Sequence, residues 1–314
     1  MRTPSIVRRE TADSGVTTHV SPIVPDVAPS QVSPKNPPDL ERMQAILSQA
    51  IGHNGPRYAI HPGDLAWWAY HSDPRTEGAV TYWLEEGRGF VVLDANNHEI
   101  AAFCVPEVSP MPLLEWGQDQ LGPDARVGFV STLDHALETE LAAGGYEVAG
   151  TEGPVFTYQI TTEDASPIAA PGLELRSLSG EEEADRRRRA SHAAFKSTME
   201  PADHLERYLR FMRSPVYEAK HDLVAVTPDG TIAAFMIWWP DASGIAQIEP
   251  MGTDPAFQRQ GVGQALMRYA FSRMSGEGVT EVRVITDDHR LDAVGFYSSL
   301  GFTRIADLRF WRLS

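Results

Sequence analysis

The spacing of apolar residues in the last quarter of the chain predicts a strand, a loop and a helix, in that order. Residues 244–253 are short, mixed in polarity and follow a polar turn, which is typical of a strand. Val262, Leu266 and Tyr269 then recur at helical spacing, and the helix that they predict begins near Gly261. The loop between the two elements therefore exposes backbone N–H groups at the start of a helix.

This loop contains glycines and suits a bound phosphate. Its N–H groups can surround an anion, and the first turn of the helix adds further N–H groups and its dipole. Spacing excludes two phosphate motifs: Leu266 stands where a dinucleotide fingerprint needs glycine, and Gly263 is followed by Gln264, not by the lysine of a P-loop. What remains is Gln258-x-x-Gly261-x-Gly263, for which an ordinary flexible helix start is the alternative.

The pattern resembles the acyl-CoA loop of the GNAT superfamily of N-acyltransferases. A second signature of that family, Ala-x-x-x-Tyr followed by Gly-Phe, is matched by Ala293, Tyr297 and Gly301–Phe302. A predicted strand at 281–286 separates the two motifs, and the likeness covers residues 173–314. It implies an α/β (α+β) fold with a mixed, mostly antiparallel sheet flanked by helices, and acetyl-CoA as the acyl donor.

The resemblance also assigns residues to acetyl-CoA. In the family, the strand before the loop diverges from its neighbour, so that free backbone groups can hold the thioester and the pantetheine arm. Family members often have asparagine where this chain has Arg290, and a cation there suits a polyanionic cofactor. The predicted cofactor contacts are Met251, Gly252, Thr253, Gln258, Arg259, Gln260, Gly261, Val262, Gly263, Gln264 and Arg290.

Two residues fall at the family's positions for proton transfer. Acyl transfer to an amine requires the ammonium to lose a proton and the leaving thiolate to gain one. On the resemblance, Tyr297 is the general acid and Glu249, the one carboxylate in the predicted strand, is the base. The alternatives are an aromatic core residue for Tyr297 and an exposed strand glutamate for Glu249.

Three residues are candidates for contact with the acceptor. Trp238 and Trp239 end a predicted strand, where successive side chains point to opposite faces, so that one could line a pocket; core packing of both is the alternative. Glu200 begins a helix in a region that often covers the acceptor in this superfamily, but it also suits the positive end of a helix dipole. The arginines at 186–189 are predicted to form a solvated face of i, i+4 pairs.

The two halves of the chain look related. Segments 90–103 and 223–235 each consist of two apolar strands around a polar turn, and both end in Ile-Ala-Ala-Phe. Gly145-Tyr146 similarly resembles Gly301-Phe302, so a duplicated domain is the simplest account, with chance similarity as the alternative. The first copy has no Gln-x-x-Gly-x-Gly and is predicted to be degenerate. The tandem plan resembles mycothiol synthase-like two-domain GNAT proteins.

Composition divides the chain further. Residues 1–39 are rich in Pro and Ser without period and are predicted to be a tail or an extended arm, followed by a degenerate domain at 40–165 and a catalytic domain at 173–314. Residues 40–172 carry a net charge of −14, from 5 Arg and no Lys against 19 Asp and Glu, whereas 173–314 carry −2. Such acidity disfavours nucleic acid and anionic membranes and would attract a cation, although plain solubility also explains it.

The sequence contains neither an apolar stretch long enough to span a membrane nor a signal peptide, so a cytoplasmic location is expected. Its one cysteine, Cys104, excludes an intramolecular disulfide and a thiolate metal cluster, and no metal is expected. The expected function is acetyl-CoA-dependent N-acetylation of a small primary amine such as an antibiotic, an amino acid or a polyamine-like metabolite. The alternatives are acetylation of protein lysines or N-termini and a non-catalytic acyl-CoA-binding scaffold; a homodimer is possible.

Overall fold

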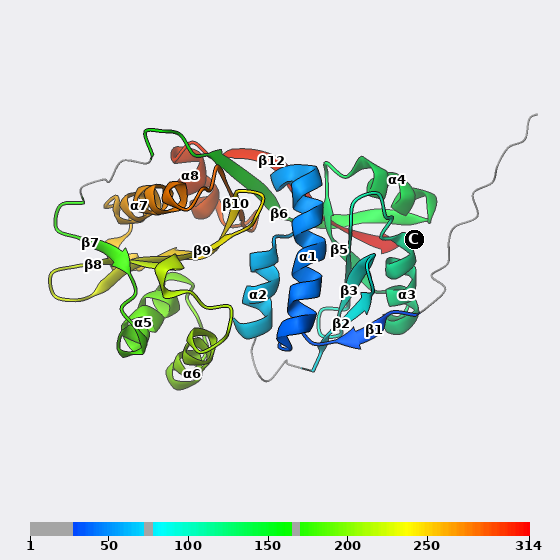
Figure 1. Ribbon diagram of the computed structural model, residues 1–314, viewed down its shortest axis with the longest axis horizontal. Helices are drawn as coiled ribbons and strands as arrows, with labels where there is room; N and C mark the ends of the chain where they lie inside the picture. The colour runs from blue at the N-terminus through cyan, green and yellow to red at the C-terminus, as the bar shows by residue number, and fades with distance from the viewer. Residues whose placement is uncertain (1–27, 72–77, 165–169) are drawn as a thin grey trace, which may run out of the picture.

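The computed structural model describes residues 28–71, 78–164 and 170–314, which form one twelve-stranded sheet with helices on both faces (Figure 1). The first half of the chain forms β1 (Ser30–Val32), α1 (Pro37–Asn54), η1 (Gly55–Arg57), α2 (Pro62–His71), β2 (Val80–Glu85), β3 (Gly89–Asp94), β4 (Glu99–Cys104), α3 (Met111–Leu121), β5 (Arg126–Ser131), α4 (His135–Ala143) and β6 (Tyr146–Gln159). The second half forms β7 (Glu174–Ser177), η3 (Glu181–Glu183), α5 (Ala184–Ala194), α6 (Pro201–Met212), η4 (Ala219–His221), β8 (Asp222–Val226), β9 (Ile232–Pro240), β10 (Ile245–Thr253), η5 (Pro255–Phe257), α7 (Val262–Gly276), β11 (Glu281–Ile285), α8 (Leu291–Ser299) and β12 (Thr303–Leu313). The predicted α/β class is confirmed.

The two halves repeat the same order of helices and strands, apart from the short 3₁₀ segments. Gly145 and Gly301, with φ of +85° and +91°, precede β6 and β12 and occupy equivalent places in this repeat. The predicted pairing of 90–103 with 223–235 is wrong in register, because 90–103 spans β3 and β4 whereas 223–235 spans β8 and β9, the counterparts of β2 and β3. The shared Ile-Ala-Ala-Phe thus reflects similar burial of two non-equivalent strands.

The last strand of each half is exchanged with the other half. The strand order is β1-β2-β3-β4-β5-β12-β6-β11-β10-β9-β8-β7, so β12 lies between β5 and β6, and β6 lies between β12 and β11. Trp311 of β12 is buried in a core cluster with Leu141 and other residues of the first half, and Phe156 of β6 is buried with residues of the second half. The predicted division at 165–173 is therefore not a division of the sheet.

Residues 1–27 of the predicted tail lie outside the described residues. Ser30–Val32 pair antiparallel with β2, as an extended arm would, but α1 already begins at Pro37, inside the predicted 1–39 tail. Proline is favoured in the first turn of a helix because its missing N–H has no intrahelical partner there. Pro37 and Pro38, at the end of the predicted tail, therefore form the start of α1.

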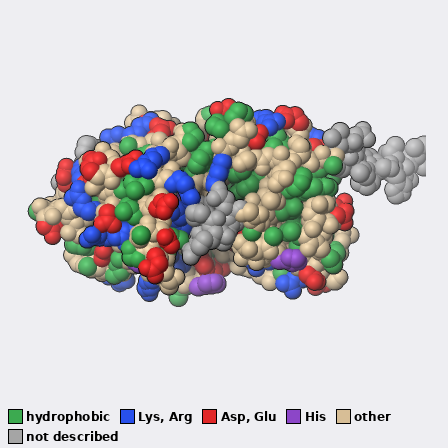
Figure 2. All heavy atoms as spheres, turned by 90° about the horizontal axis from the view of Figure 1, so that it is seen from below, with side chains coloured by type: hydrophobic (Ala, Val, Ile, Leu, Met, Phe, Trp, Pro, Cys, Tyr) green, Lys and Arg blue, Asp and Glu red, His purple; other side chains and the backbone are tan. Residues whose placement is uncertain are grey.

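Four consecutive arginines cannot all face solvent on one helix, and the prediction of a solvated face at 186–189 is wrong for Arg187 and Arg188, which are both buried. The side chain of Arg187 is 2% exposed, donates a hydrogen bond to buried Asp222 at 3.3 Å and lies 3.7 Å from the ring centroid of Phe235. Arg188 is paired with Asp185 of the same helix. The surface of the second half, at the left in Figure 2, has acidic and basic side chains mixed together, without a continuous patch of either sign.

Within the described ranges, no helix combines the length and apolar composition needed to cross a bilayer, and no three His, Cys, Asp or Glu side chains gather as metal ligands would. Cys104 is buried, and burial raises the pKa of its thiol to about 12. A thiol with so high a pKa is a poor nucleophile, which agrees with a packing role.

Candidate active site

The predicted divergence of the strand before the loop is present in β10. Its parallel pairing with β11 ends at Gln247↔Arg283, whereas its antiparallel pairing with β9 continues to Thr253↔Ala234. Within the described part of the chain, no strand therefore pairs with one edge of Met251, Gly252 and Thr253, and all three residues are half-buried. An unpaired strand edge leaves backbone groups free to bind an extended ligand.

The loop after β10 presents a row of free N–H groups. Arg259 and Gly261 have φ of +62° and +78°, and α7 starts at Val262 as the sequence predicted. Among the described residues, no acceptor is bonded to the N–H groups of residues 259–264. Backbone that alternates into the left-handed region, followed by a helix N-terminus, forms a concave anion site, so these residues fit the diphosphate of an acyl-CoA.

The side chains of the loop hold it in shape. Gln258 donates a hydrogen bond to the carbonyl of Thr253 at 3.1 Å, and Gln260 donates to the carbonyl of Ala256 at 2.9 Å. These two predicted cofactor residues are thus placed to contribute backbone groups, while their amides fix the turn.

The two glycines of the motif have different surroundings. A Cβ added to Gly263 would lie 2.8 Å from Oγ1 of Thr253, so Gly263 allows α7 to pack closely against the end of β10. A Cβ on Gly261 would meet nothing within 4 Å. Gly261 therefore borders open space and supplies the left-handed turn.

Glu249 lies at a β-bulge. Ile248 pairs with Trp238 and Met251 with Met236, so Glu249 and Pro250 together face one residue of β9. Bulges redirect side chains and are frequent beside active sites, and proline, which has no N–H, is tolerated there. The carboxyl group makes no hydrogen bond or ion pair with the described residues, and burial together with the charge of Asp64 raises its pKa to about 8.

Tyr297 reaches the same place from α8. Its side chain is 6% exposed and packs between Phe296 and Phe302, and its hydroxyl makes no hydrogen bond within the described part of the chain. Burial is the first cause and the charge of Glu249 the second cause that raises the pKa of Tyr297. The two predicted proton-transfer residues are therefore close enough for their charges to interact.

Asp64 was not predicted from the sequence. It lies in the first turn of α2 and accepts a hydrogen bond from the backbone N–H of His61 at 2.8 Å; burial raises its pKa to about 6. Contact between the halves is close here, since a Cβ added to Gly63 would lie 2.2 Å from Cβ of Trp239. Only this long-range packing, to which no local pattern points, brings a residue of the first half to Glu249.

The predicted acceptor residues have different fates. Both tryptophans are buried, Trp238 fully, as the core-packing alternative expected. Trp239 still touches the site, because its indole N–H donates a hydrogen bond of 2.8 Å to the carbonyl of Glu249. Glu200 is exposed at the N-cap of α6 without a capping hydrogen bond.

Arg290 is the N-cap residue of α8. Its guanidinium is paired with Asp292 at 3.3 Å and lies 6.0 Å from the ring of Phe195. Phe195 and Leu291, the residue that follows Arg290, are exposed apolar residues, 40% and 76% accessible. The charge of Arg290 also acts to lower the pKa of Tyr297, so Arg290 lies within electrostatic reach of that hydroxyl.

Comparison with known proteins agrees with this geometry. Residues 187–302 match the model of the acetyltransferase (GNAT) family. Over 95 residues the chain is 34% identical to mycothiol acetyltransferase from Kineococcus radiotolerans, and this match covers only 30% of each protein. A tandem GNAT protein from the clavulanic acid biosynthesis pathway superposes with a TM-score of 0.61 at 13% identity, covering 90% of this chain and 96% of that one. A GCN5-related N-acetyltransferase from Sphaerobacter thermophilus superposes with a TM-score of 0.54 at 18% identity, covering 92% of this chain and 96% of that one.

These likenesses agree with one another. Residues 187–302 are similar to the acetyltransferase domain of the GNAT family. The chain as a whole has the tandem GNAT fold, in which this domain is the second half.

Proposed function

We propose that the protein is an acetyl-CoA-dependent N-acetyltransferase whose working site lies in the second half and whose acceptor is a small primary amine. The observation that carries the proposal is the sequence of features along β10 and α7. Glu249, a half-buried carboxyl without a partner among the described residues, is followed by an open strand edge and then by the N–H groups of residues 259–264, to which no described acceptor is bonded. This order matches that of acetyl-CoA, in which the thioester is followed by the pantetheine arm and then by the diphosphate.

The loop and the open edge would hold the cofactor. The N–H groups of residues 259–264 would bind the diphosphate, with exposed Arg259 adding positive charge. The free edge of Met251–Thr253 would bind the pantetheine arm and orient the thioester carbonyl. Acetyl-CoA supplies the activated acyl group.

The two proton transfers would use Glu249 and Tyr297. An amine enters as an ammonium, and the carboxylate of Glu249 removes its proton, directly or through water. As the amine nitrogen bonds to the acyl carbon, the carbon–sulfur bond breaks and the Tyr297 hydroxyl donates a proton to the sulfur. The nitrogen then loses its second proton to form the amide, and this proton restores the Tyr297 hydroxyl. An ammonium beside Glu249 also favours the ionised carboxylate, because opposite charges lower the pKa of a carboxyl group.

The position of α2 supports a small acceptor. This helix belongs to the first half but lies at the centre of the molecule, against β9 and β10 (Figure 1). It covers the bulge at Glu249 and brings Asp64 to it. A covered site of this kind suits a compact amine better than a lysine within a folded protein.

Thiol release from acetyl-CoA tests the proposal. We expect release with a panel of small primary amines and little with lysine-containing peptides of the same concentration. Release with the peptides alone would favour the protein acetyltransferase. Stabilisation of the fold by acetyl-CoA without release by any amine would favour the acyl-CoA-binding scaffold.

A further inference from the structure

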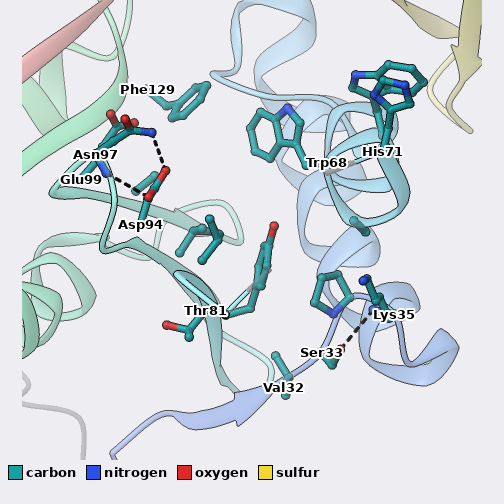
Figure 3. A pocket seen from close by; sticks show the side chains of 18 of the residues that line it. Val32, Ser33, Lys35, Trp68, His71, Thr81, Asp94, Asn97, Glu99 and Phe129 are labelled. Atoms are coloured by element: carbon teal, nitrogen blue, oxygen red, sulfur yellow. Dashed lines mark hydrogen bonds between the residues drawn. The ribbon is translucent and has the colours of Figure 1, made fainter. Parts of the chain in front are cut away.

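A cavity lies in the first half, away from the residues proposed for catalysis. It has a volume of about 740 Å³ and opens between the arm at 31–35, the end of α2 and the strands β2 to β5. Figure 3 shows Glu99 and Phe129 on one side, with Trp68 and His71 on the other. Its volume is that of a small-molecule site.

Two β-bulges aim side chains into this cavity. In β6, Gly153 pairs with Leu308 and Thr151 with Arg309, so that Glu152 is the extra residue. In β5, on the other side of β12, the register with β12 also shifts, and Phe129 adopts a φ of +57°, which a bulky residue rarely does. Bulges turn side chains out of the regular alternation of a strand.

The two bulges are joined by a hydrogen bond. The backbone N–H of Phe129 donates to Oε2 of Glu152 at 3.1 Å, and Oε1 of Glu152 has no partner among the described residues. The bond fixes both side chains as lining residues of the cavity. The guanidinium of Arg126, whose charge acts on Glu152, is already engaged with Glu99 at 3.0 Å and lies 3.9 Å from the ring of Phe310.

The walls around this carboxyl group are aromatic. Trp68 and Phe129 have ring centroids 5.2 Å apart, and Tyr82 and Trp67 also line the cavity. Aromatic faces attract organic cations through their quadrupoles, and a carboxylate among them adds a full negative charge. From the cavity, its aromatic walls and the free oxygen of Glu152, we infer that the first half binds a small organic cation, with the charged group beside Glu152.

This site goes beyond the proposed acetyl transfer. It requires neither acetyl-CoA nor Glu249, and none of the residues proposed for catalysis lines it. The first half, which lacks the phosphate loop, thereby retains a ligand site of its own.

Choline and its neutral isostere 3,3-dimethylbutan-1-ol are suitable probes, because they differ by one charge and have nearly the same shape. We expect calorimetry to show choline binding at least about tenfold more tightly than the alcohol, as a desolvated cation–π and ion-pair contact would give. Equal affinities of choline and the alcohol, or no binding of choline at about 10 mM, would overturn the inference.

Glu152→Gln is the matched variant. The amide oxygen still accepts the hydrogen bond from Phe129, so the bulges are retained while the charge is lost. Choline should then bind about as weakly as the alcohol. Glu249→Gln, in the other half, should leave choline binding unchanged. Loss of choline binding in Glu249→Gln but not in Glu152→Gln would place the cation in the catalytic site instead.

The pH dependence gives an independent readout, because the charge of choline does not titrate. Burial and the charge of Glu99 raise the pKa of Glu152 to about 8, so ionised Glu152 increases from pH 6.5 to pH 9 and choline should bind more tightly. Glu99 is held by Arg126, His71 has a pKa far below its ordinary value through burial, and Lys35 has a pKa lowered by burial. In Glu152→Gln the dependence should flatten. A wild-type affinity that does not change with pH would contradict the assignment of Glu152.

Discussion

Asp64 in the first half lies close enough to Glu249 in the second half for its charge to raise the pKa of the Glu249 carboxyl group. The contact crosses from α2 to β10, next to the hydrogen bond that Trp239 donates to Glu249. The first half thus takes part in the environment of the proposed base, although it lacks the phosphate loop.

Replacing Asp64 should move the pH profile of acetyl transfer. Asp64→Asn keeps an oxygen for the N–H of His61 but removes the charge that disfavours ionised Glu249, so the rise of kcat/KM with pH should occur at lower pH than in wild type. Initial rates from pH 6 to 10 measure this. Asp119→Asn, an exposed change on α3, is the control. An unshifted Asp64→Asn profile would show that the two carboxyls are not coupled in the reaction.

Replacing Glu249 should remove a pH-dependent step. In wild type, kcat/KM should rise as the pH passes through about 8 and Glu249 becomes ionised. Glu249→Gln cannot accept a proton, so its rate should be lower at neutral pH and recover only as the amine loses its own proton, near pH ~10 for a lysine-like amine. If the two profiles overlay, Glu249 is a structural residue.

Replacing Tyr297 should separate chemistry from binding. Tyr297→Phe removes the hydroxyl that would protonate the leaving sulfur and keeps the ring that packs between Phe296 and Phe302. We expect kcat to fall by about 10²-fold. The dissociation constant of acetyl-CoA, measured by calorimetry, should stay near the wild-type value. Full turnover by the variant would leave Tyr297 as a core aromatic.

A negative charge at the start of α7 should weaken acetyl-CoA binding. Gln264→Glu places a carboxylate on the exposed first turn, where it repels a diphosphate but suits the helix dipole, so the melting temperature without ligand should not fall. The dissociation constant should rise by about tenfold at low salt and by less at high salt. Gln120→Glu on α3 makes the same change at an exposed position far along the chain. Gly263 is less suitable, because any side chain there would meet Thr253. Equal weakening by both variants would argue against the loop as the anion site.

Truncation of a β12 side chain should destabilise the first half. Trp311 is 6% exposed and is buried among residues of the first half. Trp311→Ala should lower the free energy of unfolding by about 3–5 kcal/mol, whereas the neighbouring exposed change Arg312→Ala should have little effect. Urea unfolding measures both. A Trp311→Ala protein as stable as wild type would contradict the exchanged arrangement.

The sequence predicted the local structure around the loop well. The apolar spacing near Val262 placed α7 correctly, and residues 244–253 and 281–286 form β10 and β11. These elements depend on short-range periodicity, which a single sequence displays. The positions of Tyr297 and Glu249 came from family resemblance, and the structure brings the two side chains together, although their roles stay a prediction.

Three features could not be predicted. The strand exchange, the approach of Asp64 and the paired bulges at Glu152 and Phe129 all depend on contacts between segments far apart in the sequence. A bulge adds one residue to one strand, so it is visible only once the partner strand is known. Burial of Arg187 was missed for a similar reason, since its partner Asp222 belongs to β8.

The exchanged strands also have a consequence for biosynthesis. On the ribosome, a chain is made from its N-terminus, and domains ordinarily fold as soon as they emerge. Here the pairing of β5 and β6 is incomplete without β12, which follows the other described strands in the sequence. Until it is synthesised, both strands expose unpaired edges that could pair with another chain. The central part of the sheet, where β12 lies between β5 and β6, can therefore form only after β12 has been synthesised.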